Sequence, residues 1–474
     1  MSQKHGAERR KISSIWIDGI NGDQLVHFEF SGSRTLILHG RNGSGKTQAL
    51  RIIDSILNVN LLVLSYYKFE TALIRYEDDT EIVVSYVDSF PNSRKGGFSF
   101  SWGKGKETST ELIEIELLER AVRNELHAVR AEPDSFYWVF ERESRGLSSE
   151  SGRLVSSDDL QERLNVLTTF EKIIGGNSGV LARIAKIRTT LLSAHCQFIG
   201  THRLVANAGI RHFGTNHKLA KLSRFLPIQG LASRMVEYIQ ESLKEVERLR
   251  SKFDSEFPTK IFELETLGYS PFVDIADSFE RIYDERMLFK EQLGIGFEPM
   301  GFAPNEATEL DPALRKVASL YLKGQYEQMA PLRQLLERVD IFKRLVNGRL
   351  WRKSIAISQE FGLRVHPRDS KSGAVDYSLS IPLEKLSTGE QHEIYLFFNL
   401  VFADDNPALI LIDEPEISLH VAWQRSFIND ILEASRFTNP RFIIATHSPQ
   451  IIGSREDQLV TFVSHREPLS GFGR

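Results

Sequence analysis

LSTGEQHE at residues 386–393 and LILIDEPEISLH at residues 409–420 are the two ends of the stretch that decides the fold of this chain. The apolar residues 409–412 form a continuous run of strand length, which is typical of a strand buried on both faces. Asp413 and Glu414 follow at the carboxyl end of that strand, where open α/β sheets place their chemistry. One of two such carboxylates can hold a magnesium ion, and the other can polarise an attacking water molecule.

The amino-terminal end of the stretch is rich in turn-forming residues and leads into a predicted helix. Ser387, Thr388 and Gly389 precede Glu390, and residues 393–402 (EIYLFFNLVF) are expected to be helical. Backbone N–H groups at the start of a helix are a natural place for a phosphate group. We therefore predict that residues 387–390 contact a nucleotide. Both ends of the stretch are expected to serve one nucleotide, without necessarily belonging to the same subunit.

A second motif lies near the amino terminus, where residues 40–47 (GRNGSGKT) match the pattern GxxxxGK[ST] in full. The motif follows a short apolar strand and precedes a predicted helix at 48–60, which is the context it requires. Its glycines allow the backbone to curl around phosphates and to point N–H groups inward. Lys46 is expected to reach the β and γ phosphates of ATP, and Thr47 to ligate magnesium. The predicted nucleotide-binding residues are Gly40, Arg41, Asn42, Gly43, Ser44, Gly45, Lys46 and Thr47.

A histidine follows a second apolar strand near the carboxyl terminus. The segment RFIIATHSPQIIG predicts a buried strand that ends before Thr446, His447 and Ser448. Taken alone, a histidine in this place is more often a loop or core residue than part of a site. Beside the other motifs, His447 is well placed to contact a γ-phosphate, and we predict a catalytic role for it.

Composition excludes several classes of protein. The chain has 474 residues, enough for two or three domains, and its 26% charged residues are ordinary for a soluble globular protein. A net charge of −4 indicates no global basic field for nucleic acid. Cys196 is the single cysteine, so an intramolecular disulfide and a cysteine-only metal site are excluded. The polar amino terminus and the lack of a membrane-length apolar run predict a cytoplasmic protein without membrane segments.

Periodicity predicts the remaining elements. Strands are expected within residues 12–38, 71–118, 353–358, 362–367 and 375–383, and the second of these ranges predicts an antiparallel sheet with one solvated face. Asn21-Gly22 predicts a tight turn. The expected helices are 230–253, 275–293, 313–350 and 421–435, and Pro331 is expected to interrupt or kink the third.

The four motifs, in this order, resemble those of the ATP-binding-cassette (ABC) ATPases, in particular the branch with structural-maintenance-of-chromosomes (SMC) and recombination-repair ATPases. Residues 40–47 match the Walker A loop, and 386–390 match the family signature, with Glu390 in its fifth position as in the SMC branch. Asp413 and Glu414 match Walker B and its catalytic glutamate, and His447 matches the switch histidine. The resemblance implies magnesium-dependent hydrolysis of ATP.

The resemblance also implies an α/β fold and a quaternary structure. The expected head has a mixed sheet with the P-loop and an antiparallel β subdomain, and a helical arm is inserted between its two lobes. Its parts are the amino-terminal lobe 1–204, the arm 205–345 and the carboxyl-terminal lobe 346–474. The active unit is expected to be a head-to-head dimer, within a higher homo-oligomer, in which each ATP lies between Walker A of one subunit and Ser387 and Gly389 of the other.

Two departures from the family pattern are visible. The family usually has a glutamine after a strand just before the arm, whereas residues 199–203 are IGTHR, so the residue that senses magnesium is not identified. The zinc hook of the long-armed repair ATPases needs a CxxC motif, which a chain with one cysteine does not have.

The carboxyl-terminal third resembles the ATPase subunit of Septu-type anti-phage defence systems in LSTGEQHE, LILIDEPEISLHVAWQ and ATHSPQII. That resemblance implies a separate HNH nuclease subunit as partner, and contact with DNA through the nuclease complex. Alternatives are a PARIS-type defence ATPase with a TOPRIM effector, and a RecF-like repair ATPase that clamps DNA. A transporter motor is a further alternative, which the helical arm and Glu390 disfavour.

Overall fold

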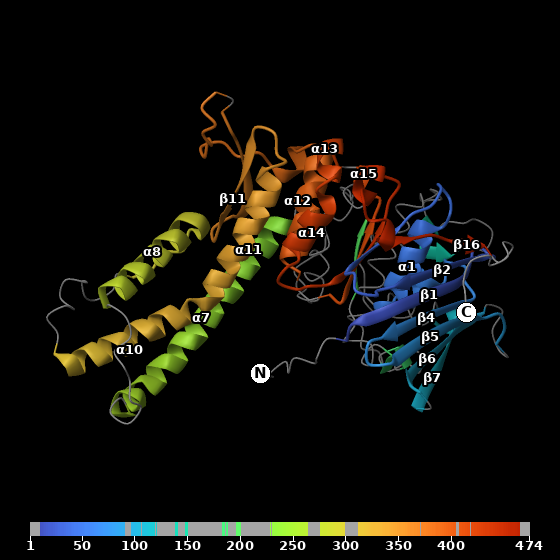
Figure 1. The fold of residues 1–474 in the computed structure, drawn as a ribbon, viewed down its shortest axis with the longest axis horizontal. Coiled ribbons are helices and arrows are strands. Elements are labelled where there is room, and N and C mark those ends of the chain that lie inside the picture. The colour runs from blue at the N-terminus through green and yellow to red at the C-terminus, as the bar shows by residue number, and fades with distance from the viewer. Residues whose placement is uncertain are drawn as a thin grey trace. The chain divides into compact units, whose positions relative to one another are not determined.

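The structure is a computed structural model. It describes residues 10–90, 96–105, 107–118, 120, 138–140, 147–149, 183–184, 186–187, 196–200, 228, 230–263, 275–298, 311–369, 371–403, 407–417 and 419–464. The chain divides into two compact units, one of residues 1–222 with residues 403–474 and the other of residues 223–402. Figure 1 labels the helices and strands of both units.

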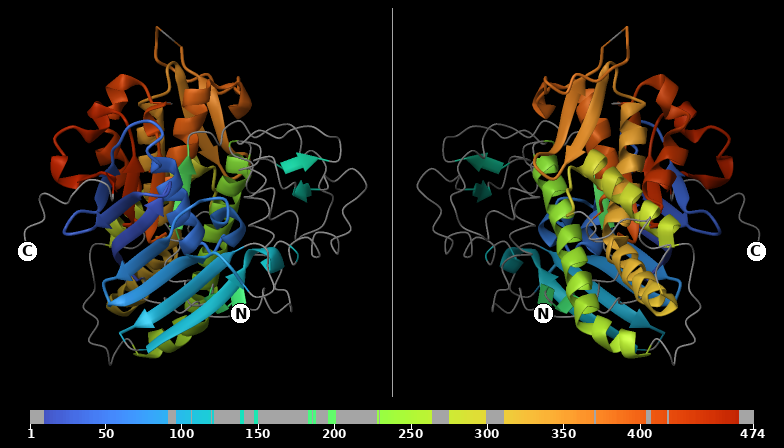
Figure 2. Two further views of the ribbon diagram at one scale, coloured as in Figure 1. Left: turned by 90° about the vertical axis from the view of Figure 1, so that its right-hand side faces the viewer. Right: turned by 90° about the vertical axis from the view of Figure 1, so that its left-hand side faces the viewer.

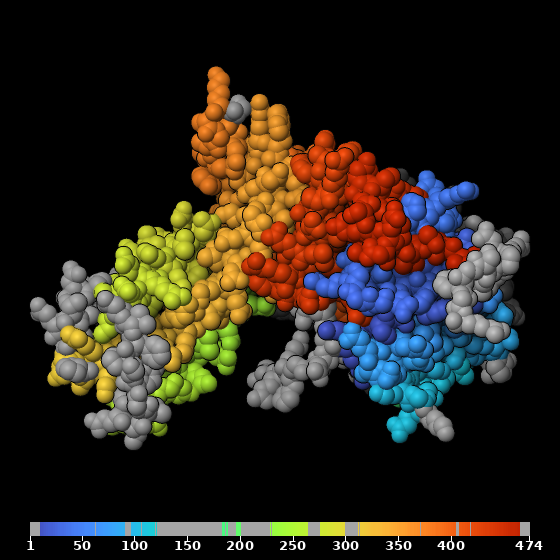
Figure 3. All heavy atoms as spheres, viewed as in Figure 1, coloured from blue at the N-terminus to red at the C-terminus, as the bar shows by residue number. Residues whose placement is uncertain are grey.

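The first unit contains a parallel sheet that joins the two ends of the chain. Its described strands are β3 (Thr35–Leu38), β10 (Cys196–Gly200), β13 (Leu409–Asp413), β14 (Arg441–Ala445) and β15 (Leu459–Val460). Their order is β10-β13-β14-β3-β15, and every neighbouring pair is parallel. Figure 3 shows carboxyl-terminal residues of this unit, in red, packed against amino-terminal residues, in blue. Strands from both ends of the chain therefore share one carboxyl edge.

The register aligns the carboxyl ends of four of these strands. Gly200 lies opposite Asp413, Asp413 lies opposite Ala445, and Ala445 lies opposite Leu38. All of β13 is buried, as the apolar run in its sequence predicts. Helix α1 (Lys46–Leu57) packs against β10, β13 and β14. The segments that follow these strands consequently meet at one edge of the sheet.

The first unit also contains an antiparallel sheet, which confirms the prediction for residues 71–118. Its described strands are β1 (Ile12–Ile20), β2 (Gln24–Glu29), β4 (Thr71–Tyr76), β5 (Thr80–Val87), β6 (Gly97–Lys104), β7 (Glu107–Glu114) and β16 (Val463–Ser464), in the order β16-β2-β1-β4-β5-β6-β7. Figure 2 shows the strands of this sheet that lie within residues 12–114, in blue to cyan, as one twisted sheet. One face carries fully buried side chains such as Phe98 and Phe100. The predicted turn at Asn21 and Gly22 has φ of 55° and 98°, which suits a primed hairpin turn.

Short elements complete this unit. They are α2 (Leu61–Leu64), the hairpin of β8 (Trp138–Phe140) and β9 (Leu147–Ser149), η5 (Pro415–Ile417), α13 (Val421–Gln424), α14 (Phe427–Ala434), α15 (Pro449–Ile452) and η6 (Glu456–Gln458). Residues 421–435 were predicted as one helix, and that prediction is wrong. The helix is interrupted at Ser426, whose Oγ donates to the Trp423 carbonyl at 3.2 Å and to Asp430 Oδ2 at 2.6 Å.

The second unit is mainly helical. It contains α7 (Gly230–Glu263), α8 (Ile275–Leu293), α10 (Pro312–Gln328), α11 (Ala330–Asn347), the hairpin of β11 (Lys353–Ser358) and β12 (Gly362–Pro367), η4 (Leu383–Lys385) and α12 (Thr388–Val401). Helix α11 packs on α7 and α12, and α7 packs on β12. The rings of Phe342, Phe398 and Phe402 are all buried, and Phe342 meets the other two edge-on. Burying each such ring stabilises the packing by about 1.5–3 kcal/mol.

The helix predictions for this unit hold, with changes of boundary. The prediction for 275–293 matches α8. The predicted interruption of 313–350 occurs at Met329, and Pro331 lies in the first turn of α11, where a missing N–H costs no hydrogen bond. Helix α7 runs to Glu263 and contains Pro258, so it is longer than predicted.

The strand predicted at 375–383 is wrong. Residues 377 and 378 form a turn, Leu383 begins η4, and isolated bridges join Val375 to Arg368 and Ile381 to Val365. The alternating sequence suggested a strand, but Asp376 Oδ1 accepts hydrogen bonds from the backbone N of Ser378 at 3.0 Å and from its hydroxyl. Such a side-chain bond to the local backbone competes with a strand ladder.

The sheets and helices confirm the α/β fold class, with a P-loop sheet, an antiparallel sheet and a helical unit inserted between two segments of the first unit. Residues 346–402 were predicted to belong to the carboxyl-terminal lobe, whereas the second unit contains them. Local packing accounts for this, since β12 packs on α7 and α12 packs on α11. Among the described residues, no helix has a stretch long and apolar enough to cross a membrane.

Candidate nucleotide-binding site

The predicted phosphate loop connects β3 to α1. Gly43 and Gly45 have φ of 77° and 89°, a left-handed conformation that side chains disfavour. A Cβ added to Gly45 would lie 3.0 Å from Ile20 Cγ2, so packing against the end of β1 also leaves little room for a side chain. Nothing lies within 4 Å of the corresponding point at Gly43. The loop therefore curls tightly and leaves open space on one side.

The amino terminus of α1 suits an anion. No side chain caps it, and its first turn has no acidic residue. The first N–H groups of a helix lack partners within the helix, and the positive end of the helix dipole favours negative charge. Thr47 is exposed in this first turn. The loop, the uncapped helix and the Thr47 hydroxyl together fit the phosphates of a nucleotide and its magnesium ion.

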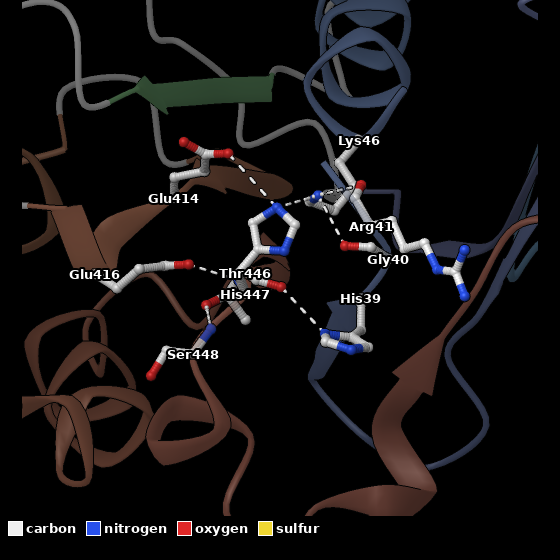
Figure 4. Close-up of polar contacts among 9 residues, drawn as sticks. All are labelled: His39, Gly40, Arg41, Lys46, Glu414, Glu416, Thr446, His447 and Ser448. Carbon is white, nitrogen blue, oxygen red and sulfur yellow. Dashed lines mark hydrogen bonds and ion pairs between the residues drawn. The ribbon is translucent and has the colours of Figure 1, made fainter. Parts of the chain in front are cut away.

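Lys46 follows the glycine-rich loop, and its side chain lies inside that loop. Its side chain is buried, and its Nζ donates to the carbonyls of Gly40 at 3.1 Å and Arg41 at 3.2 Å. Its third contact is with His447 Nε2, at 2.5 Å (Figure 4). Burial lowers the pKa of Lys46, and the charge of Glu414 is the largest of the opposing effects. The lysine is thus held at the position where the motif predicts phosphate.

The strand order explains why His447 meets Lys46. His447 follows β14, and β14 lies between β3, which leads to the loop, and β13, which leads to Glu414. The histidine therefore lies between the lysine and the glutamate, and Figure 4 shows the three side chains converging. Glu414 Oε1 is 3.9 Å from His447 Nε2.

Glu414 has an unusual backbone conformation. Its φ is 46°, in the left-handed region that a non-glycine residue occupies at a cost of order 1–3 kcal/mol. Its backbone N–H donates to the Ala445 carbonyl at 2.8 Å, which extends the β13–β14 pairing by one residue. Such conformations persist where the surrounding structure enforces them, and they concentrate at functional sites. Asp413, one residue earlier, is buried at the end of β13.

Two further residues of this edge were not predicted from the sequence. Glu416 Oε1 accepts the backbone N–H of His447 at 2.5 Å. His39 Nδ1 lies 3.4 Å from the Thr446 carbonyl, and its ring meets that of His447 edge-on at 6.5 Å between centroids. The signals that were available are the second glutamate of the DEPE segment and the histidine directly before the glycine-rich loop.

The signature residues belong to the second unit and begin α12. Ser387 and Glu390 form a capping box, in which Ser387 Oγ accepts from the Glu390 N–H and Glu390 Oε2 accepts from the Ser387 N–H. Lys353 Nζ donates to the other oxygen of Glu390 at 2.7 Å. Burial raises the pKa of Glu390, but the bonds from Lys353 and Ser387 outweigh it and hold that pKa below its usual value. Thr388 is exposed and Gly389 half-buried.

The predicted residues are thus distributed over two units. The first unit brings together residues 40–47, Asp413, Glu414 and His447 at the carboxyl edge of the parallel sheet. The second unit contains residues 387–390. The segment 201–203, where the family's glutamine was sought, lies outside the described residues.

Comparisons with known proteins indicate the type of site. Residues 313–453 match the protein family described as "AAA domain, putative AbiEii toxin, Type IV TA system". Two curated proteins of Mycobacterium tuberculosis, from strains CDC 1551 / Oshkosh and ATCC 25618 / H37Rv, are each named an uncharacterized ABC transporter ATP-binding protein. Each is 28% identical over 151 residues, which are 32% of this chain and 56% of theirs. The chain spans about half the length of these curated relatives. The findings point to an ATPase.

Solved structures similar to this chain include SMC head domains. One is the head with an extended coiled coil, bound to the carboxyl-terminal domain of ScpA, from Pyrococcus furiosus, with 14% identity, a TM-score of 0.36 and 96% of each chain covered. Another is the head with a coiled coil and joint from Pyrococcus yayanosii, with 13% identity, a TM-score of 0.32, and 96% of this chain and 97% of that chain covered.

Proposed function

We propose that the protein binds ATP with magnesium at residues 40–47 and hydrolyses it with the help of Glu414 and His447. The observation that carries the proposal is the convergence of Lys46, His447 and Glu414 at one edge of the parallel sheet, from segments far apart in the sequence. A cation for phosphate, a carboxylate for water and a histidine between them form a set suited to phosphoryl transfer to water.

Each side chain has a defined task in this proposal. Lys46 neutralises charge on the β and γ phosphates, and Glu414 orients and polarises the attacking water. His447 holds the γ-phosphate relative to that water. Thr47 and Asp413 hold magnesium, which supplies further charge neutralisation when bound. Magnesium that binds together with a nucleotide typically has few protein ligands, because phosphate oxygens and water supply the others.

The proposed active unit is a head-to-head dimer. The support is the family resemblance together with the start of α12, where Ser387 and Thr388 are exposed and Gly389 is half-buried. In the dimer, Ser387 and Gly389 of one subunit contact ATP held by residues 40–47 of the other.

The proposed biological role is anti-phage defence with a separate HNH nuclease subunit that ATP controls. The resemblance of residues 386–393, 409–424 and 445–452 to the Septu-type ATPase supports it. A rival comes from the matched family, whose description names a toxin. In that case the chain would arrest growth without a nuclease partner.

Phosphate release by the purified protein, with and without magnesium, tests the ATPase proposal. Turnover that needs magnesium and is lost in Lys46→Ala is expected, and no turnover above that of Lys46→Ala would contradict it. Co-expression with the neighbouring gene, followed by mass measurement of the purified complex, tests the partner. Growth arrest on expression of this chain alone would favour the toxin instead.

A further inference from the structure

The segment after β14 is held by a carboxylate from the segment after β13. The strand β14 ends at Ala445, so the N–H of His447 has no partner in the sheet and must find one elsewhere. Glu416 supplies it, since its Oε1 accepts that N–H at 2.5 Å (Figure 4). A hydrogen bond to an ionised acceptor is roughly twice as strong as one between neutral groups.

A second tether joins the same two segments. Ser448 Oγ donates to Gln424 Oε1 at 2.6 Å, and Gln424 is itself buried and donates from Nε2 to the Leu419 carbonyl at 3.1 Å. The Ser448 N–H donates to Thr446 Oγ1 at 3.0 Å. The His447 N–H and the Ser448 hydroxyl are therefore both bound to residues 416–424, the segment that follows Glu414.

Glu416 and Glu414 belong to one tight turn. The N–H of Ile417 donates to the Glu414 carbonyl at 3.2 Å, which closes the 3-10 turn η5 over Glu416. The backbone that carries Glu414 is thus connected through one side chain to the backbone that carries His447. Within the described residues, Glu416 Oε2 is buried and makes no hydrogen bond. The carboxylate therefore contacts the His447 N–H through Oε1 alone.

We propose that Glu416 is a positioning residue, which holds His447 in place between Lys46 and Glu414 through the backbone N–H of His447. This inference rests on the proposed function, because it assigns a task within the same site. Glu416 acts through His447 and does not itself touch the reacting atoms. Displacement of a group that orients the reaction by about 1 Å costs on the order of 10²-fold in rate.

Substitution of Glu416 by alanine and by glutamine separates positioning from folding. Glu416→Ala removes the acceptor and should lower kcat by about 10²-fold, while the Kd for ATP changes less than about threefold because residues 40–47 keep the phosphates. Glu416→Gln retains an amide oxygen for the His447 N–H and should recover most of kcat. Glu456→Ala, at an exposed position of the same unit, is the control. Wild-type kcat in Glu416→Ala would overturn the proposal.

A double-mutant cycle with His447→Ala shows whether Glu416 acts through the histidine. If it does, Glu416→Ala added to His447→Ala should change kcat by less than about threefold, because groups that act as a unit are not additive. If the two substitutions instead lowered kcat by independent factors that multiply in the double variant, the proposal would be overturned. The ATP affinities of the same variants show whether any loss comes from binding instead of turnover.

Hydrogen exchange tests the hydrogen bond between Glu416 and the His447 N–H, even if the protein proves not to hydrolyse ATP. The amide of His447 should exchange faster in Glu416→Ala than in the wild type and in Glu456→Ala, measured on a peptide that begins at least three residues before His447. Unchanged exchange in that peptide would overturn the tether, whatever the turnover. Faster exchange in a protein without ATPase activity would instead contradict the proposed function alone.

Discussion

Lys46 and His447 are 401 positions apart in the sequence, yet Lys46 Nζ and His447 Nε2 lie 2.5 Å apart. The contact follows from the placement of β14 between β3 and β13. The Lys46 ammonium group donates in this contact, and Nε2 can accept only when it carries no proton itself. The ammonium group is therefore satisfied by two carbonyls of its own loop and by His447.

Lys46→Ala tests the phosphate loop. The substitution removes the charge that faces the phosphates, and hydrogen bonds between charged groups contribute about 1.5–3 kcal/mol each. We expect ATP affinity to fall by at least about 10²-fold and hydrolysis to be lost. Titration calorimetry with ATP and magnesium provides the measurement, and Lys11→Ala, at an exposed position of the same unit, is the control. Binding as tight as in the wild type would show that the nucleotide lies elsewhere.

Ser387→Arg tests whether the signature acts in the partner subunit. A bulky cation at the start of α12 should block ATP-dependent dimerisation while monomers still bind ATP. The substitution also removes the helix cap, at a cost of about 0.5–2 kcal/mol. Ser387→Ala removes the cap without the bulk and serves as the matched control. Mixing Ser387→Arg with Lys46→Ala should restore at most one of two composite sites, and full hydrolysis by Ser387→Arg alone would exclude the sandwich.

Glu393 should make stability depend on pH. Glu393 and His392 are buried in α12, and burial raises the pKa of Glu393 to about 8 although Arg349 opposes it, while burial lowers the pKa of His392 to about 4. Between pH 4.5 and 8 the unfolded chain has lost the Glu393 proton and the folded chain keeps it, so stability falls as pH rises. His392 acts in the opposite direction only between about pH 4 and 6.5. Between pH 6.5 and 8, therefore, the change in stability comes from Glu393 and not from His392.

Urea unfolding at pH 6.5 and 8 measures this dependence. One pKa unit corresponds to about 1.4 kcal/mol, so Glu393 should lower the free energy of unfolding by about 2 kcal/mol across that window. Glu393→Gln should remove most of this loss, whereas the exposed control Glu384→Gln should retain it. Equal slopes in Glu393→Gln and the wild type would mean that Glu393 is ionised in the folded protein.

The sequence predicted those parts of the structure that depend on local patterns. The apolar run before Asp413, and the glycines and lysine of residues 40–47, identify a strand and a loop wherever they occur. The strand order is not local, because the adjacency of β14 to both β3 and β13 depends on how distant segments pair. The task of Glu416 was hidden for the same reason, since its partner is 31 positions away.

The two wrong predictions have local physical causes that the hydrophobic pattern does not include. Residues 375–383 alternate like a strand, but the Asp376 carboxylate bonds to Ser378 and turns the chain. Residues 421–435 have the spacing of one amphipathic helix, but the Ser426 hydroxyl bonds to the carbonyl of Trp423 and the helix is interrupted. In both cases a short polar side chain bonds to its own backbone or a near neighbour's.

Glu414→Gln tests the proposed chemistry most directly. The alternative role for Glu414 is to cap the turn that follows it. The structure disfavours that alternative, because the N–H of Ile417 donates to the backbone carbonyl of Glu414 and not to its side chain. The carboxylate is instead directed toward His447, with Oε1 3.9 Å from Nε2.

Glutamine keeps the size and an acceptor oxygen of Glu414 but cannot take a proton from water. We expect ATP affinity to be retained and hydrolysis to fall by about 10²-fold or more, the usual contribution of a general base. The variant should accumulate as an ATP-bound dimer, and an associated nuclease should remain in a single state. Phosphate release checks the loss of hydrolysis and size-exclusion mass in ATP and magnesium checks the dimer, with Glu456→Gln as the exposed control. Turnover near that of the wild type would return Glu414 to a structural role, because only a catalytic carboxylate requires its charge.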